Sequence, residues 1–255
     1  MPLALAFGNS HTGPYVRGHQ LARAAGRIGC DVHGMVFHGD RYEPYILHTD
    51  RGVAFNPTVA EDILATIDRL QPDCLITACL GSDHWGYGMV SDARPFDFVV
   101  PALPQCPMSP GAELIPYDLM LRRFHIDMDW QFGIVRTLRT SCKLPILHIE
   151  APPPVDDVDL MLKGVLPHMK ERIEQLGVPT VSHRYKMWWI WTHATKRFCV
   201  EFGAHFIEGP AETRDANGFL NPRYFGDGLH GSDEYGAVMA GEVVKVMRSL
   251  GISGA

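Results

Sequence analysis

The chain has 255 residues, of which 46% are apolar and 20% are charged, a composition typical of a folded globular protein. A formal net charge of −6 and the lack of any run of Lys or Arg argue against a nucleic-acid partner. No stretch approaches the length of a membrane span, and the first residues lack the basic flank of an export signal. We therefore expect a single domain over residues 1–255, located in the cytoplasm, with its scattered cysteines reduced.

Short apolar runs alternate along the chain with longer segments of helical period, a pattern typical of βα units around a parallel sheet. The predicted strands occupy residues 3–7, 32–37, 74–79, 145–149 and 204–207. Apolar side chains recur with helical spacing within residues 21–28, 63–70, 162–176, 188–202 and 239–250. The sequence predicts an α/β protein of three layers, α/β/α, with a doubly wound, mostly parallel sheet of five strands.

Residues 91–118 interrupt this pattern because they contain six prolines. Proline lacks the amide hydrogen that a helix interior or a central strand needs, so the segment can be neither. Long irregular segments within compact domains are usually functional. We expect this segment to be an insertion that borders or covers the substrate site.

The first predicted strand ends in Gly8-Asn9-Ser10-His11, just before a helix. Backbone amides and the helix dipole at such a position favour a negatively charged oxygen. A serine hydroxyl placed there can act as a nucleophile if a base lies within hydrogen-bonding distance. The same tetrapeptide could instead be a helix N-cap, because serine is a favoured capping residue.

A candidate base lies near the other end of the chain, in Asp227-Gly228-Leu229-His230. An aspartate three residues before a histidine can hold the imidazole in one tautomer while the other ring nitrogen faces a nucleophile. The alternative is a surface turn in which Asp227 caps the last helix. The loop position, together with a serine after the first strand, favours a catalytic role.

Polar residues also follow the third predicted strand, in Gly81-Ser82-Asp83-His84. The carboxyl ends of parallel strands meet at one edge of a sheet, which is where ligands bind. Asp83 and His84 are therefore candidate substrate contacts, as is His11 beside the serine. Asp83 could equally cap a turn, where aspartate is common.

Two of these motifs resemble blocks of the SGNH/GDSL hydrolase superfamily. Residues 8–11 are similar to the block that carries the catalytic serine, although Asn9 stands where aspartate is more usual. Residues 227–230 are similar to the block that supplies the catalytic aspartate and histidine from one short loop. The resemblance implies a flavodoxin-like SGNH hydrolase fold with Ser10, Asp227 and His230 as its catalytic triad.

The resemblance also implies an oxyanion hole, to which the amides of Ser10 and Gly39 would contribute. The family usually has Gly-x-Asn after the third strand, and this asparagine completes the hole. Residues 81–83 are Gly-Ser-Asp instead. If Asp83 takes this position, its carboxylate would repel the oxyanion, whereas Ser82 would supply a shorter donor and His84 could also donate. We assign the position to Ser82, and the sequence leaves the choice open. Loss of one such donor typically costs about 2.7–4 kcal/mol of transition-state stabilisation.

The chain contains thirteen histidines, which raises the question of a metal site. It lacks the His-Glu-x-x-His and His-x-His spacings that are typical of metal ligands. It also lacks the Gly-Lys-Ser/Thr ending of a phosphate-binding loop and the glycine pattern of a dinucleotide site. We therefore expect neither a metal nor a cofactor.

The sequence thus predicts a serine esterase that removes an O-acyl group, most simply O-acetyl, from a carbohydrate or small metabolite through an acyl-enzyme on Ser10. Residues 94–101, 151–154 and 218–220 resemble segments of an SGNH-like group from bacterial glycan loci, which implies the carbohydrate. A glycan O-acyltransferase and a non-catalytic glycan- or metabolite-binding protein of the same fold are the alternatives. The sequence leaves the oligomeric state open.

Overall fold

The computed structural model describes residues 1–37, 41–43, 46–49, 52–78, 87–165, 167–252 and 254. At its centre is a sheet of five parallel strands in the order β2-β1-β5-β8-β9. These strands are β1 (Leu3–Gly8), β2 (Asp31–Val36), β5 (Cys74–Ala78), β8 (Ile146–Ile149) and β9 (His205–Ile207). The predicted strands agree with them to within one residue at each end, so the predicted α/β fold class is confirmed.

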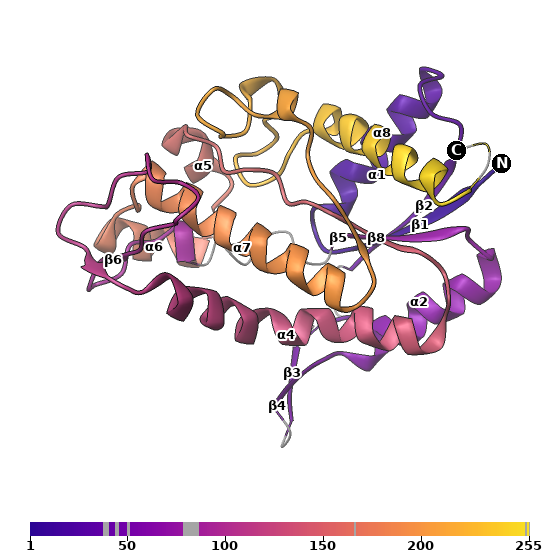
Figure 1. The fold of residues 1–255 in the computed structure, drawn as a ribbon, viewed down its shortest axis with the longest axis horizontal. Coiled ribbons are helices and arrows are strands. Elements are labelled where there is room, and N and C mark those ends of the chain that lie inside the picture. The colour runs from indigo at the N-terminus through magenta and orange to yellow at the C-terminus, as the bar shows by residue number, and fades with distance from the viewer. Residues whose placement is uncertain are drawn as a thin grey trace.

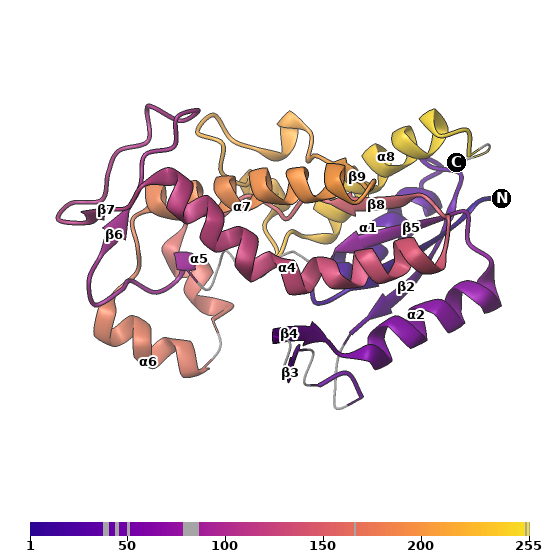
Figure 2. The same cartoon turned by 60° about the horizontal axis from the view of Figure 1, so that its bottom comes forward.

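Helices cover both faces of this sheet (Figure 1, Figure 2). One face carries α1 (Thr12–Ala24) and α8 (Asp233–Ser249). The opposite face carries α2 (Pro57–Leu70), α4 (Tyr117–Ser141) and α7 (Val181–Glu201). The sheet is therefore the middle layer of an α/β/α arrangement, as the sequence predicted.

Each face of the sheet buries its own apolar core, because successive side chains of a strand point to opposite faces. In β1, Ala4 and Ala6 belong to the core shared with α1 and α8. Leu5 and Phe7 belong to the core on the other face. Trp191 of α7 is buried in that second core, so the aromatic residues of this helix serve packing.

Two short strand pairings were not expected from the sequence. An antiparallel hairpin of β3 (Ile46–Thr49) and β4 (Gly52–Phe55) precedes α2. Within the proline-rich segment, β6 (Phe96–Asp97) pairs in parallel with β7 (Glu113–Leu114). The strands of both pairs are too short to show a regular alternation of apolar and polar residues, so hydrophobic periodicity does not reveal them.

The apolar pattern at residues 162–176 predicted one long helix, and this prediction is wrong. The structure has two helices, α5 (Val158–Lys163) and α6 (Pro167–Leu176). Pro167 begins the second helix because proline cannot donate the hydrogen bond that a helix interior requires, whereas the first turn tolerates it. Two single turns of 3-10 helix, at Ala211–Thr213 and Pro222–Tyr224, lie between β9 and α8.

The pattern at residues 21–28 also misplaces the buried face of α1. Leu21 is half exposed, whereas Tyr15, His19 and Ala22 are buried. The helix turns this second face inward because it packs closely against α8. Among the helices that the structure describes, none combines the length and the apolarity needed to cross a membrane.

Candidate active site

Ser10 lies in the turn between β1 and α1, at the carboxyl edge of the sheet. The amide of Thr12 donates to the carbonyl of Asn9 at 3.0 Å, and the amide of Gly13 donates to the carbonyl of Ser10 at 3.3 Å. The N-cap of α1 falls on His11, whose side chain makes no capping hydrogen bond. Ser10 therefore precedes the N-cap and is not the capping residue of this helix.

Asp227 and His230 lie in one tight loop before α8. A bridge between Phe225 and Gly231 closes this loop. The Asp227 carboxylate accepts from the backbone amide of His230 at 2.8 Å, and its Oδ2 lies 2.8 Å from Nδ1 of the same histidine. A carboxylate can only accept, so Nδ1 carries the hydrogen, and Nε2 of the neutral ring keeps its lone pair.

The charge state of Asp227 follows from the same contacts. Partial burial by itself raises the pKa of a carboxyl group. Here the hydrogen bonds from the His230 ring and from the amides of His230 and Leu229 outweigh it, and the pKa of Asp227 lies well below its usual range. The carboxylate is ionised at neutral pH and can stabilise a positive charge on the ring of His230.

Close packing of α1 against α8 brings the two ends of the chain together. A Cβ on Gly18 would lie 2.3 Å from the backbone nitrogen of Ala237, and one on Gly236 would lie 2.3 Å from the carbonyl oxygen of Pro14. Only glycine permits backbones to approach this closely. Because Gly18 and Gly236 have no side chains, α1, which follows Ser10, can pack directly against α8, which follows His230.

Ser10, Asp227 and His230 consequently line one open groove with a volume of about 720 Å³. An ion pair supports its wall, because Nε of Arg17 in α1 donates to both carboxylate oxygens of Asp233 in α8, at 3.0 and 3.1 Å. A groove lined by both a serine hydroxyl and a carboxylate-bound imidazole contains two groups that acyl transfer uses.

Of the other predicted site residues, the structure describes only His11. His11 is buried, and its ring centroid lies 4.6 Å from that of His230, so it packs against the candidate base. Gly39, Ser82, Asp83 and His84 lie outside the described residues. Within the described ranges, no group of three or more His, Cys, Asp and Glu side chains is arranged to hold a metal.

A buried carboxylate behind the groove was missed by sequence reasoning. Glu150 follows β8 directly, and its Oε2 accepts from the amide of Gly209 at 2.7 Å and from Nη2 of Arg214 at 2.8 Å. Burial raises the pKa of Glu150 despite the guanidinium of Arg214. A charged residue directly after a predicted strand was the signal that could have revealed it.

Glu150 also lines a small cavity of about 20 Å³ together with His11 and Tyr235. The ring of His11 in turn packs on that of His230. Glu150 and the ring that contacts the candidate base therefore face the same small cavity.

Two solved structures resemble this chain over most of its length. A GDSL-like lipase from Bacteroides thetaiotaomicron VPI-5482 aligns with a TM-score of 0.52 at 13% identity, covering 97% of this chain and 88% of the lipase chain. The periplasmic domain of a lipopolysaccharide acetyltransferase from Salmonella ser. Paratyphi A aligns with a TM-score of 0.53 at 9% identity, covering 96% and 83%. No family model matches the sequence, and no curated protein matches it.

At these identities the likeness shows the fold. The chain has the SGNH hydrolase fold that its first and last motifs implied, and the order of its central strands is that of a doubly wound sheet. A fold of this kind hosts several chemistries, so the function is argued from the site.

Proposed function

We propose that the protein is a serine esterase that acts through Ser10, His230 and Asp227. The observation that carries the proposal is the 2.8 Å contact between Asp227 and Nδ1 of His230 on the wall of the groove that Ser10 also lines. Triads are recognised by such roles and not by their position in the sequence. The resemblance of both motifs to SGNH/GDSL blocks and the likeness to a GDSL-like lipase fold support it.

In the proposed mechanism, Oγ of Ser10 attacks the acyl carbonyl while Nε2 of His230 accepts the hydroxyl proton. Asp227 stabilises the imidazolium that forms. His230 then returns the proton to the leaving alcohol, and a water activated by the same nitrogen releases the acid. The amide of Ser10 would hold the developing oxyanion together with Gly39 and Ser82.

We propose an O-acyl ester, most simply an O-acetyl ester of a carbohydrate or small metabolite, as the substrate. The groove is open, and the charged side chains of Arg17, Asp233 and Glu234 line it beside apolar ones from Pro14, Leu21 and Val36. Such a wall suits a short acyl group on a polar alcohol better than a long apolar chain, which would leave the charged groups desolvated.

The test is hydrolysis of p-nitrophenyl acetate and of acetylated sugars by the wild type and by Ser10→Ala. We expect the substitution to lower kcat by about a thousandfold or more. The Tm should be unchanged, because the Ser10 side chain does not cap α1 and has no hydrogen-bond partner among the described residues. Retention of wild-type turnover by a pure Ser10→Ala preparation would overturn the proposal.

An O-acyltransferase is the second candidate, and the likeness to the acetyltransferase domain favours it. The same acyl-enzyme would then be resolved by a sugar hydroxyl in place of water. Adding candidate sugar acceptors and measuring acylated product by mass spectrometry separates the two activities. If neither hydrolysis nor transfer is found, a non-catalytic binding role of the same groove becomes the better account.

A further inference from the structure

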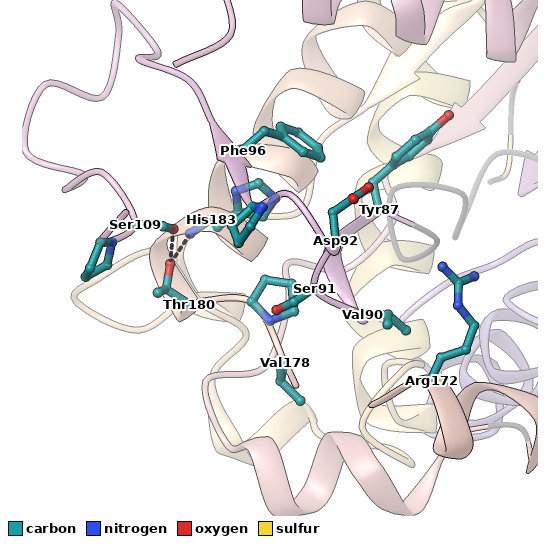
Figure 3. Close-up of a pocket in the computed structure, with 13 residues that line it drawn as sticks. Tyr87, Val90, Ser91, Asp92, Phe96, Ser109, Arg172, Val178, Thr180 and His183 are labelled. Carbon is teal, nitrogen blue, oxygen red and sulfur yellow. Dashed lines mark hydrogen bonds between the residues drawn. The ribbon is translucent and has the colours of Figure 1, made fainter. Parts of the chain in front are cut away.

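A second cleft lies apart from the groove that contains Ser10, and Figure 3 shows it. Its volume is about 420 Å³, which falls in the range of roughly 300–1,000 Å³ that is typical of small-molecule sites. Its walls come from the proline-rich segment, from residues 87–92, from α6 and from the start of α7. Among the described residues, none lines both this cleft and the groove of Ser10.

A buried ionic cluster holds the walls of this cleft in place. Asp97 is fully buried and accepts from the backbone amide of Ser109 at 2.7 Å. Its Oδ1 lies 2.6 Å from Nζ of Lys186 and 3.3 Å from Nδ1 of His183, both on α7. Lys186 also donates to the carbonyl of Pro107 at 3.2 Å. The cluster therefore ties the proline-rich segment to α7 and keeps the cleft preformed.

One side of the cleft presents groups that can both donate and accept hydrogen bonds. Oγ of Ser109 and Oγ1 of Thr180 lie 2.8 Å apart, so one hydroxyl hydrogen is used within the pair and the other is left for a ligand. Nδ1 of His183 faces the Asp97 carboxylate and carries a hydrogen, which leaves Nε2 as the acceptor of the neutral ring. Figure 3 places these three side chains together.

The remainder of the cleft offers one charge of each sign and two aromatic rings. Asp92 and Arg172 both line it, and Figure 3 shows Arg172 on the side away from Ser109. The ring of Phe96 also lines it. The hydroxyl of Tyr87 donates to Asp127 at 2.5 Å, so Tyr87 offers its ring to the cleft and not its hydroxyl.

This combination discriminates between classes of ligand. A compact anion would gain from Arg172 but would be repelled by Asp92, and it would make no use of the aromatic rings. A purely apolar molecule would desolvate hydroxyls, His183 and two charges without pairing them, which is costly. A neutral molecule with several hydroxyl groups and apolar ring faces matches both kinds of wall.

We propose that this cleft binds a neutral carbohydrate, such as a disaccharide or a two-sugar segment of a glycan. Each sugar hydroxyl can both donate and accept hydrogen bonds. It can therefore donate to Asp92, accept from Arg172 and do either with the Ser109 and Thr180 pair. The C–H faces of the sugar rings pack on Phe96 and Tyr87. This binding does not depend on the chemistry proposed for Ser10, because the two sites have no lining residue in common within the part of the chain that the structure describes.

The test is ligand-detected NMR with maltose, cellobiose, lactose and N,N′-diacetylchitobiose, measured on the Ser10→Ala protein so that no turnover interferes. At least one disaccharide should bind with a Kd of about 1–10 mM. The double variant Ser109→Ala/Arg172→Gln should weaken this binding by about tenfold or more, since it removes hydrogen-bonding groups from opposite sides of the cleft. The double variant keeps the backbone amide of residue 109, so the hydrogen bond from this amide to Asp97 is not removed.

Arg122→Gln is the matched control, because Arg122 is an exposed arginine on α4 that does not line the cleft. It should bind sugars as the parent does. Three results would overturn the proposal. These are the absence of binding by all four disaccharides at about 20 mM, equal binding by the folded double variant, and binding of inorganic phosphate in place of sugar.

Discussion

Two pairs of an aspartate and a histidine in the described part of the chain use the same chemical groups in different surroundings. Asp227 and His230 are three residues apart, and more than half of the Asp227 side chain is exposed on an open groove. Asp97 and His183 are 86 residues apart, and both are buried. In the first pair the ring nitrogen lies 2.8 Å from the carboxylate, and in the second it lies 3.3 Å away.

The difference lies in what else binds each carboxylate. Lys186 contacts Asp97 at 2.6 Å and compensates its charge, so His183 is a secondary partner. Burial alone would raise the pKa of Asp97, but its contacts with His183, Lys186 and two backbone amides hold it well below the usual range. No lysine or arginine in the described residues pairs with Asp227, so its charge is directed to His230. This difference is why we propose a catalytic role for the Asp227–His230 pair and a structural role for the Asp97 cluster.

The largest expected effect is on kcat, and it should follow from changing the Asp227–His230 pair. Asp227→Asn should lower kcat by roughly a thousandfold, because an amide no longer fixes the Nδ1–H tautomer or stabilises the imidazolium. Its Tm should change little, since an asparagine oxygen can still accept from the amide of His230. Assay of kcat with p-nitrophenyl acetate, alongside Tm, checks this. Activity within twofold of the wild type would remove Asp227 from the mechanism.

The second prediction concerns stability. Lys186→Met leaves the buried Asp97 without its main cation, and we expect a loss of about 3–5 kcal/mol in the free energy of unfolding. The control is Lys196→Met on the same helix, which breaks a partly exposed ion pair with Glu208 and should cost less than about 1 kcal/mol. Urea unfolding of both variants gives the comparison. Equal effects would show that the Asp97 cluster does not stabilise the fold.

Two buried histidines that lack a hydrogen-bonded carboxylate among the described residues give a third prediction. Burial lowers the pKa of His19 to about 4 and that of His148 to about 3. The folded state keeps these rings neutral, whereas the unfolded chain protonates them near pH 6.5. Stability from these groups is therefore complete above about pH 6.5 and is lost as the pH falls towards their folded pKa values.

Each ring contributes a slope of up to about 1.4 kcal/mol per pH unit in this range. The unfolding free energy, measured in urea between pH 7.5 and 5, should therefore fall as the pH is lowered. His148→Phe should make the dependence less steep, because Phe132 and Phe206 surround this position with aromatic rings that a phenyl group can join. An unchanged slope in this variant would contradict the assignment.

The smallest expected effect tests the contact that joins the two halves of the active site. Gly236→Ala should destabilise the fold by about 1–3 kcal/mol and lower kcat, because its Cβ would meet the carbonyl of Pro14. Gly241→Ala in the same helix is the matched control, since an added Cβ there meets nothing within 4 Å. It should be neutral or stabilising by up to about 1 kcal/mol. If the two variants had the same free energy of unfolding and the same kcat, the close contact at Gly236 would not be what holds the active site together.

The sequence was informative wherever a feature is local. The five parallel strands follow from apolar runs, and the Asp227–His230 contact follows from a spacing of three residues. The Asp97 cluster could not be foreseen, because its partners come from segments that only the fold brings together. The close approach at Gly18 and Gly236 is similarly invisible, since a helical glycine shows its purpose only when its neighbouring helix is known.

The proline-rich segment shows the same limit. Its composition correctly excluded one helix or one central strand over its length, and it suggested a border for the substrate site. In the described residues the segment lines the second cleft, through Pro95, Phe96, Ser109 and Pro110, and contributes nothing to the groove of Ser10. Composition predicts that such a segment forms a wall, whereas the packing of Asp97 and Lys186 decides which cavity it encloses.

The most direct measurement is intact-mass analysis after exposure to a fluorophosphonate probe, with the wild type and Ser10→Ala compared. This probe reacts only with a serine whose hydroxyl is activated by a neighbouring base. We expect one adduct per wild-type chain and none on the folded variant. A folded wild-type protein that stays unmodified, or an adduct that persists in Ser10→Ala, would contradict the account of Ser10 as the nucleophile activated by His230.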